Sequence, residues 1–131
     1  MQASIQAAPV SSKLLWAGRI ASALPVLMLL MSAVMKLLKS APVVEGLTHF
    51  GYAESQALGL GIVELICTLI YVIPRTSVLG AILLTGYLGG ATATHVRVGE
   101  SFLMPVIFGI LVWGGLFLRD TRLRALIPLR S

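Results

Sequence analysis

The stretch Leu83-Leu-Thr-Gly-Tyr-Leu-Gly-Gly-Ala-Thr-Ala-Thr-His-Val-Arg97 decides the fold of this chain. Most of its residues are apolar or very small, and it ends in two ionisable side chains, His95 and Arg97. Small residues let the backbones of membrane helices approach closely, because no bulky side chain separates them. We therefore expect a membrane helix that packs inside a bundle and carries polar groups at one end.

The composition extends this expectation to the whole chain of 131 residues. Hydrophobic residues make up 57% and charged residues 11%, whereas an average soluble domain is about 45–50% apolar and about 25% charged. A chain of this length cannot build a core large enough to hide such apolar runs from water. The net charge of +5 comes from basic residues at the ends of the runs and in the tail, which suits an anionic membrane surface and not a nucleic acid.

Four apolar runs are each about as long as a short transmembrane helix. They predict an all-α fold, in which four transmembrane helices form an antiparallel bundle over residues 14–118. A flexible cytoplasmic N-terminus (1–13) precedes this membrane domain, and a basic cytoplasmic tail (119–131) follows it. The four spans are expected at about 14–35, 57–73, 77–94 and 102–118.

The connection between the first and second spans carries an amphipathic pattern. Val43, Val44, Leu47 and Phe50 fall on one helical face, and Gly51 then gives a C-terminal stop. We expect a short amphipathic helix here, lying on the membrane surface or capping the bundle.

Several residues predict local details of the spans. Pro25 is expected to kink the first span, and Pro105 falls in the first turn of the fourth, where proline is tolerated. Thr76 or Ser77 is expected to cap the start of the third span, and Ser101 that of the fourth. The glycines of the last two spans should allow close helix approach rather than form a nucleotide-binding loop, which would need a preceding strand; they are Gly80, Gly86, Gly89, Gly90, Gly109, Gly114 and Gly115.

The basic residues set the expected orientation in the membrane. An even number of spans puts both termini on one side, and that side then holds seven of the ten basic residues. Basic residues favour the cytoplasmic side, so both termini are predicted to be cytoplasmic, in the inner membrane of a bacterium. The seven are Lys13, Arg19, Arg75, Arg119, Arg122, Arg124 and Arg130, against Lys36, Lys39 and Arg97 on the other side.

Glu64 is the most informative single residue, because an unpaired charged carboxyl inside a membrane span costs several kcal/mol. Counting eleven residues in both directions from the turn at Arg75 puts Gly86 and Tyr87 at the depth of Glu64, and predicts a Glu64–Tyr87 hydrogen bond. His95 would lie about 13 Å further along the third span. Glu64 would then act as a proton carrier or general acid–base group, with Tyr87 or His95 as its partner; the alternative is a hydrogen bond that only serves packing.

Other polar and aromatic residues are candidates for ligand contact. His95 can relay protons or bind a ligand, or can simply favour the negative end of its helix. Arg97 is an interfacial anchor or a ligand contact, Trp113 a packing residue or a cavity wall, and Tyr71 shares the polar face of Glu64. The sequence shows no cluster with the spacing of a metal site, and its single cysteine, Cys67, excludes an internal disulfide and a CxxC pair.

Several motifs resemble those of the DoxX-like membrane proteins, from about Arg19 to the C-terminus. They are Gly51-Tyr52, Gly61-Ile-Val-Glu64, Ile73-Pro-Arg-Thr-Ser-Val-Leu-Gly-Ala81, Leu84-Thr-Gly-Tyr-Leu-Gly-Gly-Ala91, Thr94-His-Val-Arg97 and Trp113-Gly-Gly-Leu-Phe-Leu-Arg-Asp120. The resemblance implies a small four-helix integral membrane protein, and carries over Glu64, Tyr87, His95 and Arg97 as cavity residues. It also implies functions that range from redox-associated membrane subunits to assembly proteins, but the missing cysteine pair argues against thiol–disulfide chemistry.

Three functions remain compatible with the sequence. In the first, the protein is a redox-associated membrane subunit that binds a quinone or another lipophilic small molecule in a polar pocket of the bundle and works with a redox or membrane protein partner. In the second, it is a stand-alone enzyme that uses Glu64 on an apolar substrate. In the third, it is a non-catalytic scaffold or assembly factor, whose polar residues serve packing.

Overall fold

The computed structural model describes residues 11–127, and all regular structure in this part of the chain is helical. The predicted all-α class is therefore confirmed, and so is the amphipathic helix between the first two apolar helices. The α-helices are α2 (Ser12–Leu37), α3 (Ala41–His49), α4 (Gln56–Val72), α5 (Ser77–Arg97), α6 (Leu103–Arg119) and α7 (Thr121–Leu126), and the 3-10 turn η1 (Pro74–Thr76) joins α4 to α5.

Within the described residues, helices reach further toward both termini than the sequence suggested. Helix α2 begins at Ser12, because the Ser11 hydroxyl accepts a hydrogen bond from the Leu14 amide at 3.3 Å and caps the first turn. In the basic tail, the Asp120 carboxylate accepts from the Arg122 amide at 2.9 Å and starts α7. The expected flexibility of residues 1–10, and the last four residues of the tail, lie outside the described residues.

Two helices, α2 and the η1–α5 segment, are long and apolar enough to cross a membrane. Helices α4 and α6 are also apolar but have 17 residues each, which corresponds to about 26 Å at 1.5 Å per residue. Large apolar side chains point outward along all four helices, as expected for a surface that lipid covers.

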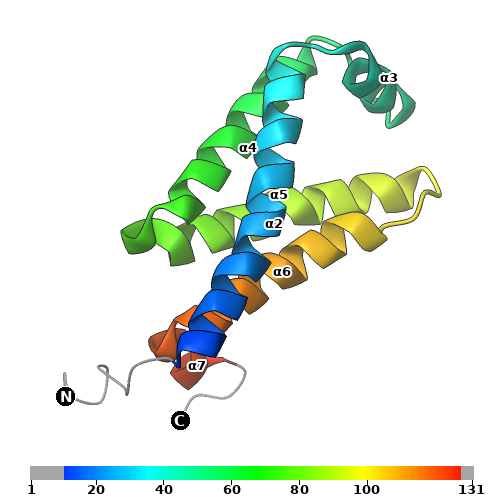
Figure 1. Cartoon of the computed structure of the whole chain (residues 1–131). Helices are drawn as coiled ribbons and strands as arrows, with labels where there is room; N and C mark the ends of the chain where they lie inside the picture. Colours follow the sequence, from blue (N-terminus) through cyan, green and yellow to red (C-terminus); the bar gives the residue numbers. More distant parts are fainter. Residues whose placement is uncertain (1–10, 128–131) are drawn as a thin grey trace.

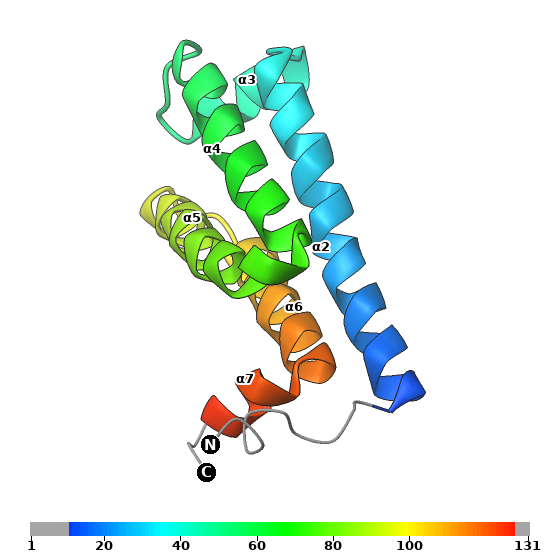
Figure 2. The same ribbon diagram turned by 90° about the vertical axis from the view of Figure 1, so that its left-hand side faces the viewer.

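The four long helices pack in a ring, with α2 and α5 each contacting both α4 and α6. Figures 1 and 2 show α4 alongside α2, whereas α5 crosses both of them obliquely. The helix axes are therefore not aligned as they would be in a simple antiparallel bundle. Figure 1 also shows α3 at one end of α2 and α7 at the other. The buried core between the helices includes Leu29, Tyr71, Leu84, Val112 and Leu116.

The turn between α4 and α5 is held by two hydroxyl groups that donate to carbonyls of residues earlier in the chain. Ser77 Oγ donates to the Tyr71 carbonyl at 2.8 Å, and Thr76 Oγ1 donates to the Ile70 carbonyl at 2.8 Å. Thr76 does occupy the N-cap position of α5, but neither hydroxyl caps that helix. Both satisfy carbonyls at the end of α4, which otherwise would lack intrahelical partners.

Of the other local expectations about the helices, some are confirmed and some are not. Pro105 lies in the first turn of α6, as predicted, whereas the N-cap is Phe102 and not Ser101. Helix α2 is continuous through the buried Pro25.

Only some of the glycines mediate close helix approach. A Cβ on Gly80 would collide with the backbone of Tyr71, and one on Gly115 would lie 2.8 Å from the Ser22 amide nitrogen. The expectation is wrong for the others, since nothing lies within 4 Å of a Cβ built on Gly86, Gly89, Gly90, Gly109 or Gly114.

Candidate ligand cavity

A buried network centred on Lys36 joins three helices. The Lys36 ammonium, in the last turn of α2, donates to Ser32 Oγ at 2.9 Å, to Glu64 Oε1 at 2.9 Å and to Tyr87 OH at 3.0 Å. These three bonds use all three hydrogens of the ammonium group. The side chains of Glu64 and Lys36 are 2% and 13% exposed, so the two charges neutralise each other away from solvent.

Gly61 explains how Lys36 at the end of α2 reaches into the protein. A Cβ on Gly61 would lie 3.0 Å from the Lys36 Cβ and 3.1 Å from the Ala33 carbonyl oxygen. The two backbones can approach so closely only because Gly61 has no side chain. Glu64 follows Gly61 by three residues and faces the same neighbour, so the lysine side chain bends one turn deeper to meet it.

Lys36 is the residue of the candidate site that sequence reasoning missed. The expected meeting of Glu64 and Tyr87 does occur, but Lys36 stands between them and bonds to both. Its position at the end of the first span made it look like an interfacial charge. The signal that could have found it is the cost of a buried carboxylate, which calls for a cation from a neighbouring helix.

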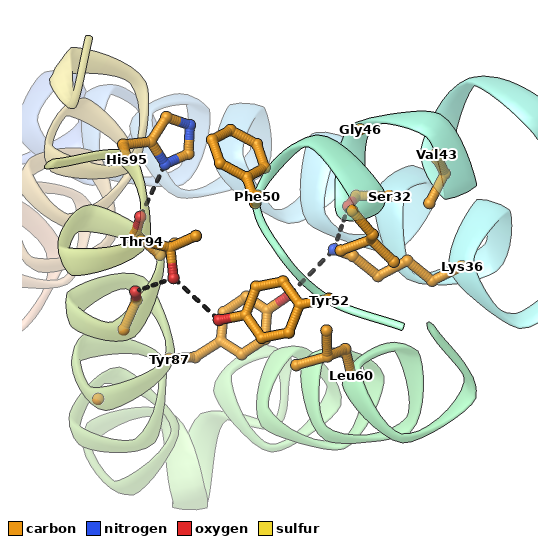
Figure 3. Close-up of a pocket in the computed structure, with 14 residues that line it drawn as sticks. Ser32, Lys36, Val43, Gly46, Phe50, Tyr52, Leu60, Tyr87, Thr94 and His95 are labelled. Atoms are coloured by element: carbon orange, nitrogen blue, oxygen red, sulfur yellow. Dashed lines mark hydrogen bonds between the residues drawn. The ribbon is translucent and has the colours of Figure 1, made fainter. Parts of the chain in front are cut away.

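The Lys36–Tyr87 pair forms the floor of a cavity of about 470 Å³ between α3 and the second half of α5 (Figure 3), called the Lys36 cavity below. Val43, Leu47 and Phe50, three of the residues predicted on the apolar face, line it from α3 and its C-terminal end. On the opposite side, Gly86 and Gly90 leave space where side chains would otherwise stand. The lining is therefore mostly apolar and carries a few polar side chains.

Tyr52, Thr94 and His95 also line the Lys36 cavity (Figure 3). Thr94 Oγ1 donates to the Gly90 carbonyl at 2.8 Å, so it accepts the hydrogen of Tyr52 OH, 2.9 Å away. His95 Nδ1 lies 2.7 Å from the Ala91 carbonyl oxygen. A carbonyl only accepts hydrogen bonds, so Nδ1 carries a hydrogen.

Arg97 holds α3 in place and does not line the cavity. Its guanidinium donates to the carbonyl of Phe50, directly after α3. Nearby, His49 Nε2 lies 2.8 Å from Glu100 Oε1, and both side chains are exposed. The ring of Phe50 packs against that of His95 with centroids 4.5 Å apart. These contacts attach α3 to the end of α5 and to the loop that follows it.

Tyr71 and Trp113 lie away from the Lys36 cavity. Tyr71 is fully buried, and its hydroxyl donates to the Val112 carbonyl at 2.7 Å and lies 2.9 Å from Ser22 Oγ. Trp113 Nε1 donates to Thr85 Oγ1 at 2.6 Å, between α5 and α6. The structure therefore brings Tyr87 and His95 to one cavity with Glu64 directly behind Lys36, and places Tyr71, Trp113 and Arg97 elsewhere.

The comparison with known protein families agrees with this architecture. The model of a family described as the DoxX-like family matches residues 20–115, which include every residue that lines the Lys36 cavity. The chain belongs to the DoxX-like family. This is a family of small membrane proteins, so lipid covers the outward apolar surface. No match was found among curated proteins or among solved structures.

Among residues 11–127, no three His, Cys, Asp or Glu side chains gather in a way that could hold a metal ion. Cys67 is buried.

Proposed function

We propose that this DoxX-like protein binds a neutral, lipophilic small molecule with a carbonyl head, such as a quinone, in the Lys36 cavity. In this role it is a membrane subunit that presents the molecule to a redox partner. The observation that carries the proposal is a hydrogen-bonded Lys36–Tyr87 floor beneath apolar walls. Concave, mostly apolar sites with a few convergent polar groups are typical of small-molecule binding.

The charges favour a neutral ligand over an anion. Glu64 already balances the charge of Lys36, and the three ammonium hydrogens are engaged. The Tyr87 oxygen accepts from Lys36, which polarises the phenol and makes its own hydrogen a better donor. The Glu64 carboxylate lies within hydrogen-bond reach of the same hydroxyl, so a ligand carbonyl would take this hydrogen in competition with Glu64. The apolar remainder of the ligand would lie against Gly86 and Gly90, called the glycine wall of α5.

The proposal gives the polar residues distinct roles. Tyr87 and Lys36 would touch the head of the ligand, and His95 would contact another part of it. Glu64 does not line the cavity and would act as a positioning residue for Lys36. This placement argues against Glu64 as the acid–base group of a stand-alone enzyme, because such a group must reach the substrate.

We also infer that α2, α4, η1–α5 and α6 are four membrane spans with both termini in the cytoplasm. The support comes from the four apolar helices and from the basic residues near the α2 N-terminus and in α7. Labelling of single cysteines introduced at Ser11 and at Glu54 in intact cells tests it. Only Glu54→Cys should react with an impermeant reagent; equal labelling of both would contradict the topology.

Binding is tested with the full chain in lipid nanodiscs, by titration with a short-tailed benzoquinone. We expect saturable binding that weakens about tenfold in Tyr87→Phe, the effect of one lost hydrogen bond near the upper end of its usual range. Thr85→Val is the matched control, because it lies on the same helix but outside the cavity. Unchanged affinity in Tyr87→Phe would overturn the proposed contact. No binding to the wild type would favour a scaffold.

A further inference from the structure

We propose a second binding site at the opposite end of the protein, where a cavity of about 320 Å³ takes the phosphate of an anionic phospholipid head group. The cavity lies between the start of α5 and the α6–α7 junction and is called the Arg119 cavity below. Its lining comes from Pro74, Ser77, Leu116 and residues 119–122. It is independent of the Lys36 cavity and of the function proposed for it.

The charges of the chain are separated between the two ends. Of the five acidic residues in the sequence, four belong to α3, to α4 and to the loops beside the Lys36 cavity. Only Asp120 belongs to the other end, where it shares the cavity with Arg119 and Arg122. The carboxylate of Asp120 is engaged by the first turn of α7 and lies 3.6 Å from Arg122 Nε. The lining therefore keeps a net positive charge.

Arg119 is held in a fixed orientation that leaves its outer nitrogens available. Its Nε donates to Ser22 Oγ at 3.2 Å, and its guanidinium carbon lies 5.6 Å from the centre of the Tyr71 ring. Neither Nη atom donates to an acceptor within the part of the chain that the structure describes. A guanidinium that is pre-oriented in this way presents paired donors that match the oxygens of a phosphate.

Arg122 and Thr121 complete the set of donors. The Arg122 side chain is 68% exposed, so it can move toward an anion at low cost. Thr121 also lines the cavity. Its hydroxyl has no partner among the described residues and could donate to a third phosphate oxygen. Two arginines and one hydroxyl can thus bond to one phosphate without any change in the helices.

A lipid is favoured over free phosphate because apolar surface adjoins the cavity. Leu116 forms one wall, and the exposed side chains of Ile73 and Val78 flank Pro74 and Ser77. Acyl chains can lie on this surface while the phosphate occupies the cavity. Basic pockets between membrane helices at the level of the head groups are known to hold anionic lipids in this way.

The test compares lipids retained by the full chain in nanodiscs that contain phosphatidylcholine and phosphatidylglycerol, measured by native mass spectrometry. We expect the wild type to retain phosphatidylglycerol selectively, and Arg122→Gln to lose it about tenfold, the loss expected for a charge-assisted hydrogen bond. Lys13→Gln is the matched control, because it removes one exposed positive charge near the start of α2, at the same end of the protein as α7 (Figure 1). Arg122 is preferred to Arg119, whose loss would also disturb Ser22 and Tyr71.

Two outcomes would overturn the proposal. Equal losses in Arg122→Gln and Lys13→Gln would show only a general attraction of anionic lipid to positive charge. In a second arm, inorganic phosphate is added to the protein in pure phosphatidylcholine, and thermal stability is followed. Stabilisation by inorganic phosphate, without any by phosphatidylglycerol, would assign the site to a soluble anion; stabilisation by phosphatidylglycerol alone would support the lipid.

Discussion

Each end of the molecule holds a serine, a tyrosine and a basic side chain close together, but the two tyrosines are bonded differently. At one end, Ser32 of α2 lies with Tyr87 and Lys36; at the other, Ser22 of α2 lies with Tyr71 and Arg119. Tyr71 donates its hydrogen to the backbone carbonyl of Val112 and is completely buried. Tyr87 accepts from a lysine and faces a cavity.

The difference shows what separates a packing contact from a candidate site. Both tyrosines are well positioned, but a donor bonded to a backbone carbonyl has no capacity left for a ligand. The contrast can be tested by removing the same kind of group at each end and by comparing stability with ligand binding.

The largest effect on stability is expected from Lys36→Met. This change leaves the Glu64 carboxylate buried without its cation, and breaking a buried ion pair from one side costs about 3–5 kcal/mol. The free energy of unfolding in mixed micelles measures it, with Lys39→Met, an exposed lysine close by, as the control. The double variant Lys36→Met/Glu64→Gln should recover more than half of the loss. If the double variant is as unstable as the single one, the charge of Glu64 is not the cause.

An intermediate effect is expected from Tyr71→Phe. The Val112 carbonyl keeps its intrahelical donor but loses the second one from Tyr71, and the loss of one such hydrogen bond costs about 0.5–1.5 kcal/mol. Ligand binding at the Lys36 cavity should stay unchanged, because Tyr71 does not line it. The measurement is the free energy of unfolding and the quinone affinity of both variants, Tyr71→Phe and Tyr87→Phe. If both variants lose stability and quinone binding to the same extent, the proposed difference between the two ends is wrong.

Sequence reasoning succeeded where the deciding information is local. The lengths of the apolar runs gave the helices to within a few residues. Counting from the turn at Arg75 put Glu64 near Tyr87, because the short turn η1 joins α4 to α5 and each residue advances either helix by about 1.5 Å. The amphipathic face of α3 was equally readable, since side chains three and four apart share a face.

It failed where the answer depends on how separate segments are offset. The stagger of α2 against α4, which Gly61 permits, brings Lys36 to Glu64, and the long connection between the two helices does not determine it. The glycines of α5 show the same limit. Gly80 and Gly90 look alike in sequence, but Gly80 contacts another backbone, whereas Gly90 borders empty space.

The smallest effect on stability is expected from Gly90→Leu, which should nevertheless abolish ligand binding. No atom lies within 4 Å of a Cβ built at this position, and leucine favours helix over glycine by roughly 0.5–1 kcal/mol, so folding should be unchanged or slightly improved. The added side chain would enter the Lys36 cavity and displace the ligand. Gly89→Leu is the matched control, because Gly89 faces the groove between α5 and α6. Because the glycine wall is the only feature altered, full quinone binding by a stable Gly90→Leu protein would mean that the ligand lies elsewhere.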